Sequence, residues 1–167
     1  PCEDFTQGVL PIQDDYIQLL GRLAGARILS LESPGEFLAD LTQDEETARA
    51  VIATYAAYLK PMRTNAERAA AFALYLEGRM GVMEVWDHTF QRLVYGPHGH
   101  DTLRVTDAYL LEFRNRRFVD RLGQKLAGGG VVIAVGAAHI PGDAGLVALL
   151  RNSGYMVERI PLPGEVH

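Results

Sequence analysis

The chain lacks several features that mark whole classes of protein. It has a single cysteine, Cys2, so no disulfide can form within it. This is typical of a reducing compartment, although a periplasmic protein without disulfides has the same composition. It has no block of lysine and arginine and a formal net charge of -5, which argues against nucleic acids and anionic membranes as main partners. No apolar run reaches the roughly 18 residues of a membrane span, and no signal-peptide pattern is present.

The common catalytic and nucleotide-binding motifs are also missing. There is no G-x-G-x-x-G, so dinucleotide binding is not indicated, and there is no phosphate-binding P-loop. No H-E-x-x-H marks a zinc peptidase of that type, and no serine lies in a G-x-S-x-G elbow. Because the chain begins at Pro1 rather than at methionine, we expect a processed or cut piece.

What the chain does contain predicts a mixed α/β fold. Its 167 residues, 48% of them hydrophobic, are enough for one domain with a core, and both helix formers and β-branched residues are plentiful. Residues 26–31, 131–135 and 155–160 are short apolar runs that predict strands. A predicted helix over 144–152 joins the last two by short connections, which is typical of a βαβ unit. We therefore expect a parallel or mixed sheet.

Helix signals fill most of the remaining chain. Ser33, followed by Pro34 and Glu36, has the pattern of a capping box, which predicts a helix start directly after Glu32. Residues from about 44 to 80 predict a helical insertion that covers the sheet, within a single domain of residues 1–167. The other expected helices are 11–24 and 108–127, the second capped by Thr106 or Asp107.

Two polar side chains are expected where predicted strands end. Glu32 follows the first strand and His139 follows the second, each before a predicted helix start. In open parallel sheets, ligands bind outside the carboxyl ends of the strands, where free helix N–H groups favour anions. Arg114 and Asn115 lie on the helix that leads to the His139 strand. One imidazole, one carboxylate, one guanidinium and one amide suit metal-assisted or acid–base hydrolysis.

These four side chains do not make a complete metal centre. Hydrolytic metal centres usually have three protein ligands, so His139 needs others. Either Glu32, His98 or His100 joins it, or the remaining ligands lie on residues absent from this chain. His98 and His100 are close enough in sequence to hold a metal, but a loop pair without a third local ligand is usually incidental.

The residues around His139 resemble a known family. Residues 136–142 read G-A-A-H-I-P-G, and the similarity continues through Gly145 to residues 149–155. This run resembles the C-terminal part of the TraB/GumN family, whose bacterial members are related to the Tiki metalloproteases. The order and spacing of its features agree over residues 16–160, which is most of the chain.

The resemblance implies an α/β fold of two related halves, each with a G-x-x-H motif. The paired motif histidines would lie near a divalent metal such as manganese or cobalt, with zinc as a further choice. The family also carries a glutamate after a strand and an Arg-Asn pair on a helix, here Glu32 and Arg114–Asn115. We therefore predict His139 and Glu32 as metal ligands and Glu32, Arg114 and Asn115 as catalytic residues. The first motif is expected upstream of Pro1, so the chain is expected to be the C-terminal portion of the domain. Its partner would be an upstream half-domain or a second copy, and a periplasmic or membrane-associated location is compatible with the family.

Two functional hypotheses follow. The first is a metal-dependent, peptidase-like hydrolase of peptides or small molecules. In it His139 is a metal ligand, Glu32 is a ligand or general base, and Arg114 and Asn115 position substrate or oxyanion. The alternative is a non-catalytic module that binds an anionic small molecule or peptide at the strand ends. Under a third and simpler interpretation, His139 is only a satisfied histidine at the edge of the core.

Overall fold

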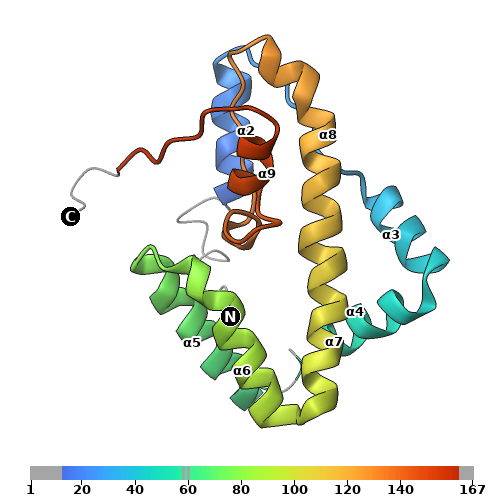
Figure 1. Cartoon of the computed structure of the whole chain (residues 1–167). Helices are drawn as coiled ribbons and strands as arrows, with labels where there is room; N and C mark the ends of the chain where they lie inside the picture. Colours follow the sequence, from blue (N-terminus) through green and yellow to red (C-terminus); the bar gives the residue numbers. More distant parts are fainter. Residues whose placement is uncertain (1–12, 58, 60, 162–167) are drawn as a thin grey trace.

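Helices form all the regular structure in the part of the chain that the structure describes. This computed structural model describes residues 13–57, 59 and 61–161 (Figure 1). Its α-helices are α2 (Gln13–Leu23), α3 (Pro34–Gln43), α4 (Glu45–Ala57), α5 (Pro61–Leu76), α6 (Met83–Tyr95), α7 (Pro97–Asp107), α8 (Arg114–Ala127) and α9 (Leu146–Asn152). Shorter elements are the 3₁₀ turns η1 (Met80–Val82) and η3 (Ala137–His139) and the π-helical segment η2 (Ala108–Phe113).

The predicted α/β fold class is wrong for the described residues, which contain no strand and no sheet. The three predicted strands at 26–31, 131–135 and 155–160 are irregular segments, and among the described residues no backbone hydrogen bond joins them to one another. Apolar and β-branched residues favour an extended backbone locally, but a sheet also needs a neighbouring strand to accept its hydrogen bonds. Without that neighbour, Val132 and Met156 keep 89% and 88% of their surface exposed.

One long helical run organises the molecule. α7, η2 and α8 follow one another without a break from Pro97 to Ala127 (Figure 1). The predicted helix cap at Thr106 or Asp107 is therefore wrong. Inside this run the Thr106 hydroxyl donates a hydrogen bond to the Thr102 carbonyl at 2.9 Å, which satisfies it within the helix.

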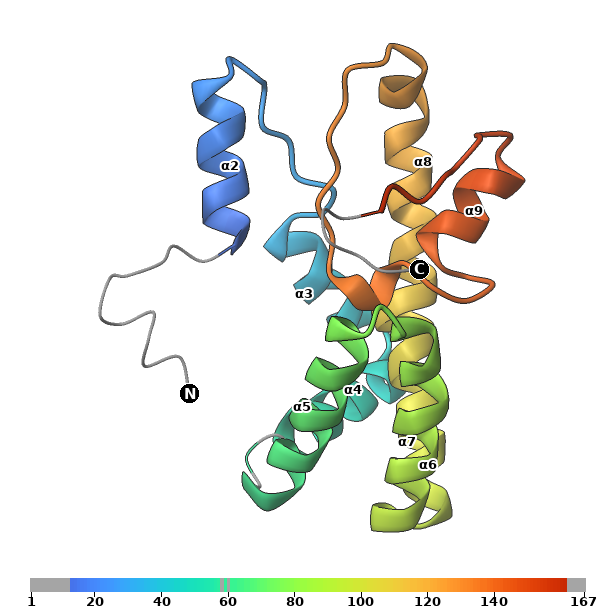
Figure 2. The same cartoon turned by 90° about the vertical axis from the view of Figure 1, so that its left-hand side faces the viewer.

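The π-helical segment separates two buried faces of this run. A π turn takes more residues than an α turn, so the face that is buried before η2 is offset from the face that is buried after it. α4 and α6 pack on α7, whereas α9 packs on α8. Figure 2 shows α2 standing apart from α8, with irregular segments drawn between them.

The core consequently forms two small seams. Between α4 and α7 it holds Ala50, Val51 and Leu103, and the Thr54 and Thr106 hydroxyls lie 3.0 Å apart across the contact. The second seam lies between α8 and α9. Its buried members are Asn115, Phe118, Leu122 and Leu146.

Local sequence signals located some helix ends. The capping box is confirmed, because the Ser33 hydroxyl accepts from the Glu36 N–H at 3.2 Å and the Glu36 carboxylate accepts from the Ser33 N–H at 2.8 Å. Within the expected helical insertion over 44–80, α5 begins at Pro61, a first helical position where the missing N–H of proline costs nothing. None of the described helices has both the length and the apolar content needed to cross a membrane.

The seam between α4 and α7 predicts a contrast between two neighbouring residues. Val51 is 1% exposed and Ile52 is 65% exposed. We expect Val51→Ala to lower the free energy of unfolding by about 1.5–2.5 kcal/mol, because it leaves a cavity. Ile52→Ala should change it by less than about 0.5 kcal/mol. Urea denaturation followed by circular dichroism measures both, and equal effects would contradict the packing.

Candidate functional site

The G-x-x-H sequence forms a single 3₁₀ turn. The His139 N–H donates to the Gly136 carbonyl at 2.9 Å, and the Ile140 N–H donates to the Ala137 carbonyl at 3.2 Å. The motif spacing is therefore the spacing of an i, i+3 hydrogen bond. His139 was expected at a strand end directly before a helix, but α9 begins only at Leu146.

The loop between this turn and α9 is held tightly by a glycine. Gly145 is buried, and a Cβ at this position would lie only 2.0 Å from the Pro141 carbonyl oxygen. Only glycine fits this close backbone approach. The fold of the loop brings the carbonyl of Ala144 to within hydrogen-bonding distance of Asn115 on α8.

Asn115 binds both ends of this loop. Its side chain is 1% exposed, and its Nδ2 donates to the Ala144 carbonyl at 2.8 Å and to the His139 carbonyl at 3.3 Å. Its Oδ1 lies 2.6 Å from His139 Nδ1. Two carbonyl partners require the amide nitrogen on that side, so the amide oxygen faces the imidazole and can only accept. Nδ1 therefore carries the proton, and Nε2 keeps a free lone pair.

The surroundings of His139 favour the neutral imidazole. Burial lowers the pKa of His139, and the nearby Arg114 charge lowers it further, while the Glu32 carboxylate acts in the opposite direction. The Phe118 ring covers the imidazole at a centroid distance of 5.4 Å. Arg114 also lies over Phe118, at 5.5 Å from its centroid.

Glu32 is clamped by the first arginine of α8. Arg114 Nε lies 3.1 and 3.0 Å from the two Glu32 carboxylate oxygens, and Arg114 Nη2 lies 2.9 Å from Oε2. The Glu32 side chain is only 12% exposed. The remaining Arg114 nitrogen, Nη1, donates to the Leu110 carbonyl in η2 at 3.1 Å. All three nitrogens of this guanidinium are thus occupied.

This pair belongs to two complementary charge stripes. Glu32, Glu36 and Asp40 are spaced four residues apart, with Glu32 just before the N-cap of α3 and the other two on the helix, and each contacts an arginine on α8. Arg117 lies 2.8 Å from Asp40 and 3.5 Å from Glu32. Arg121 pairs with Glu36 and donates to the Leu31 carbonyl at 2.5 Å.

The structure thus gathers the four residues that the sequence singled out. His139 and Asn115 are in direct contact, Glu32 and Arg114 form an ion pair, and Phe118 touches both groups. The expectation that His98 joins them is not supported, since His98 is exposed at the start of α7. The side chain of His100 lies outside the described residues. Over the described ranges, no group of three or more His, Cys, Asp and Glu side chains is placed to hold a metal ion.

Sequence reasoning missed the partners that extend the ion pair. Asp40 and Arg117 were not singled out, and neither was Tyr109, whose hydroxyl donates to the Asp40 carboxylate at 3.1 Å. A signal existed, because the acids at 32, 36 and 40 recur at helical spacing and so do the arginines at 114, 117 and 121. Only the fold shows that these two stripes face each other.

A second group of titratable side chains lies in the helical half, away from these stripes. Asp87 on α6 has a buried carboxylate oxygen with no hydrogen-bond partner among the described residues. Burial raises its pKa to about 7, and the charges of Glu67 and Asp107 add to the rise. The neighbouring His88 lies 3.5 Å from Asp107.

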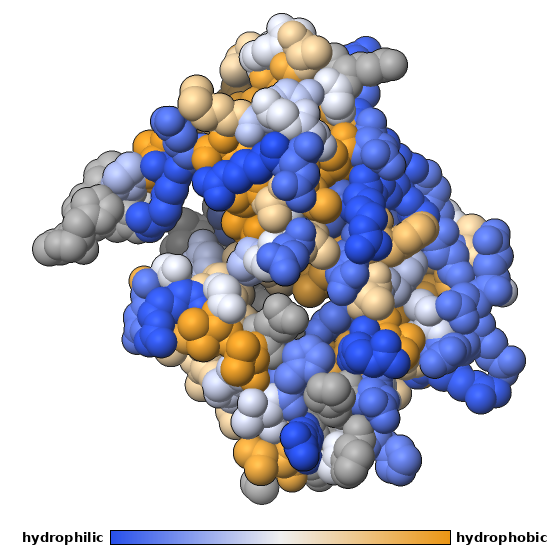
Figure 3. All heavy atoms as spheres, viewed as in Figure 1, coloured by the Kyte–Doolittle hydropathy of each residue, from blue (hydrophilic) through white to orange (hydrophobic). Residues whose placement is uncertain are grey.

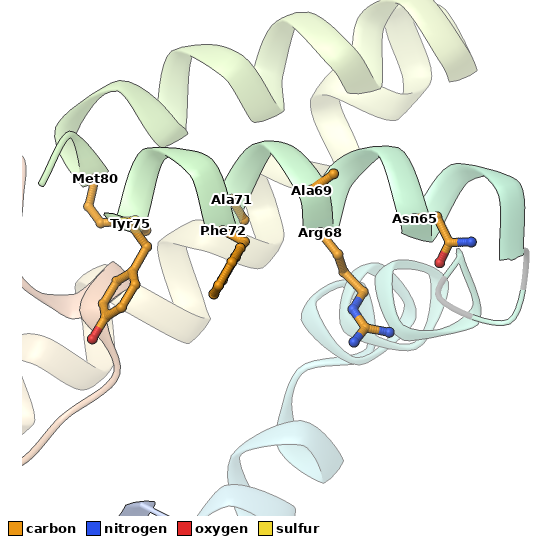
Figure 4. Close-up of a pocket in the computed structure, with 7 residues that line it drawn as sticks. All are labelled: Asn65, Arg68, Ala69, Ala71, Phe72, Tyr75 and Met80. Atoms are coloured by element: carbon orange, nitrogen blue, oxygen red, sulfur yellow. The ribbon is translucent and has the colours of Figure 1, made fainter. Parts of the chain in front are cut away.

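One surface pocket is also separate from the site. A pocket of about 670 Å³ runs along α5 (Figure 4). Arg68 and Asn65 are polar, but the other lining residues are mostly apolar, and none belongs to the site. Figure 3 shows hydrophilic residues along α8, whereas apolar and hydrophilic residues are mixed over α5 and α6. The pocket holds no pair of groups that could transfer a proton.

Comparison with known families assigns the chain. Residues 4–159 match the TraB/PrgY/gumN family. The matched range includes both the charge stripes and the His139 turn. The chain belongs to the TraB/PrgY/gumN family. The resemblance seen in the residues around His139 is thereby confirmed. No curated protein and no solved structure matches this TraB/PrgY/gumN chain significantly.

Asn115 provides a first test of the site geometry. We expect Asn115→Ala to lower the free energy of unfolding by about 2–4 kcal/mol, because two buried carbonyls and the His139 Nδ1–H lose their partner. Long-range ¹⁵N NMR should show protonated Nδ1 in the parent chain and loss of this preference in the variant. Asn152→Ala, at an exposed position, is the control. A parent His139 protonated on Nε2 would refute the assigned tautomer.

Asp87 predicts a pH dependence of stability. Its pKa is 3.8 in the reference state and about 7 in the fold, so between these values the folded chain holds a proton that the unfolded chain releases. The stabilising contribution of Asp87 is therefore lost as the pH rises from about 4 to 7. We expect the parent to lose more stability between pH 5 and 8 than Asp87→Asn does, as measured by urea denaturation. The control Asp120→Asn, at an exposed position, should behave like the parent.

Proposed function

We propose that this chain carries part of the site of a metal-dependent, peptidase-like hydrolase, with His139 as a metal ligand. The observation that supports this most directly is the contact between Asn115 Oδ1 and His139 Nδ1 at 2.6 Å. A histidine ligand commonly donates its second ring N–H to a fixed acceptor, which sets the tautomer and the ring orientation. Asn115 does both here and leaves Nε2 available to a cation.

The residues fit one part of such a site. The lowered pKa of His139, caused mainly by burial, keeps the imidazole neutral near pH 7, as a ligand requires. Because the described residues bring no three ligands together, we propose that further ligands come from residues other than these, on an upstream half-domain or a second copy. A bound divalent metal would polarise a peptide carbonyl or activate a water molecule.

Glu32, Arg114 and Asn115 then support the metal ligand rather than bind the metal themselves. Both Glu32 oxygens already accept from Arg114, so Glu32 would have to give up a contact to act as ligand or base. We propose instead that its carboxylate supplies negative charge beside the cation. Arg114 holds Glu32, and Asn115 holds His139, because the polar groups of both are engaged by the protein itself.

The alternative function, capture of an anionic ligand, has less support. An anion site needs a cation that is not already neutralised. Arg114, Arg117 and Arg121 each pair with a carboxylate of the facing stripe. Binding an anion there would require breaking one of these pairs.

Cobalt(II) titration tests the proposal. We expect calorimetric titration of the chain to show binding that His139→Gln weakens at least tenfold, because a direct ligand is removed. His98→Gln, at an exposed position, is the matched control and should leave the affinity unchanged. The stoichiometry adds a check, since one cobalt per two chains would indicate that a second copy contributes ligands. Equal affinity of the parent and His139→Gln would refute His139 as a ligand, whereas absence of cobalt binding would refute a second copy as the source of the other ligands.

A further inference from the structure

α2 presents an apolar stripe to the solvent. Four large apolar residues recur on it at three- and four-residue spacing, so they fall within about 100° of one another around the helix axis. They are Tyr16, Leu19, Leu20 and Leu23, with exposed fractions of 48%, 47%, 48% and 76%. None of the residues Gln13–Leu23, all of which the structure describes, is buried. An amphipathic helix normally covers such a stripe against a core, whereas this stripe remains half-exposed or more.

The stripe lies nearly opposite the side on which α2 meets the segment that follows it. A Cβ at Gly21 would lie 2.8 Å from Ile28 Cδ1, so the helix approaches the rest of the chain on its Gly21 side. At about 100° per residue, Gly21 is on the far side of the helix from the middle of the stripe. Figure 2 shows α2 at an edge of the molecule. The stripe therefore points away from the contact that holds α2.

The charges that border this stripe are separated along the helix. Asp15 lies in the first turn of α2, and Arg22 lies in the last. Arg22 donates to the neutral Gln18 side chain at 3.1 Å, and within the described residues no ion pair neutralises Asp15 or Arg22. Because they are seven residues apart, Asp15 and Arg22 flank the stripe on the same side, next to Leu19.

The stripe and its charges make the surface of α2 complementary to itself. When two copies of α2 pack in antiparallel directions, Tyr16 of each copy lies against Leu19 of the other, and the same register brings Asp15 close to Arg22 of the other copy. A two-fold axis repeats the contact, so two ion pairs form. A parallel pair would place the two acidic ends together and the two basic ends together. The charges therefore favour the antiparallel arrangement.

We propose that α2 is a docking surface for a second copy of this chain, which binds as an antiparallel, two-fold symmetric helix pair. The apolar stripe supplies the buried surface, and Asp15 and Arg22 fix the direction and the register. One 11-residue helix from each copy makes a small interface, so we expect a weak dimer with a dissociation constant of about 10–500 μM. The pairing does not depend on the proposed function, because no metal takes part in it.

Sedimentation equilibrium of the full chain, without added metal, tests the pairing. We expect the parent to form a reversible dimer and Leu19→Ser to weaken it at least about tenfold, because each dimer loses two leucine side chains from the contact. Leu93→Ser on α6 is the matched control, since Leu93 is 80% exposed. It should leave the dissociation constant within about twofold of the parent value.

Charge reversal tests the direction and the register. Asp15→Lys and Arg22→Glu should each weaken the dimer about five- to thirtyfold, because two attractive pairs become two repulsive ones. An equimolar mixture of the two variants should associate nearly as tightly as the parent, since the new lysine then faces the new glutamate and the retained Arg22 faces the retained Asp15. All these differences should shrink as the salt concentration rises.

Each possible outcome either supports or overturns the pairing. A parent chain that stays monomeric at about 1 mM overturns it, and so does a dimer that Leu19→Ser leaves unchanged. A mixture that associates no more tightly than the single variants overturns the antiparallel register. Each reversal also opposes the helix dipole, but mixing would not repair a helix that had merely been destabilised. If circular dichroism shows that Leu19→Ser loses helix, the mixture of charge variants decides.

Discussion

The site depends on one buried amide. Asn115 is almost fully enclosed, and its three hydrogen bonds join α8 to the His139 turn and to the loop before α9. A buried amide is stable only when its donors and acceptor are satisfied, so its partners must stay in place. The same three bonds that fix the loop also set the tautomer of the imidazole. The hydrogen bonds of Asn115 therefore both stabilise the loop and leave Nε2 of His139 unprotonated.

The charge stripes play a similar double part. The pairs between α3 and α8 attach a helix that otherwise contributes little to the buried core, since none of its residues is fully buried. Exposed pairs of this kind contribute little stability, but the Glu32 pairs are mostly sheltered and balanced in charge. Their charges also reach His139, whose pKa Arg114 lowers and Glu32 raises. The π-helical segment takes part by supplying Tyr109 and the Leu110 carbonyl.

The three apolar segments that predicted strands are irregular in the described residues, although the chain belongs to a family for which a sheet was expected. The chain belongs to the TraB/PrgY/gumN family, yet the three apolar runs that predicted strands carry no sheet in the described residues. Their side chains are apolar, and several are exposed, including Val132, Met156 and Ile160. A strand is defined by a partner, which local sequence does not specify. The proposed metal site likewise needs groups from elsewhere, because His139 is its single histidine.

The sequence by itself determined the local features. Ser33 and Glu36 located the start of α3, and the run of residues 136–142 around His139 indicated the family. Each of these depends on residues a few positions apart, where hydrogen bonds and helical spacing decide.

The tertiary structure alone decided the rest. It showed the continuous run through η2, the absence of a sheet among the described residues, the Asn115–His139 contact, and the meeting of Glu32 and Asp40 with arginines about 80 residues away. Such long-range pairings follow from how helices pack, and no local pattern encodes which polar group faces which.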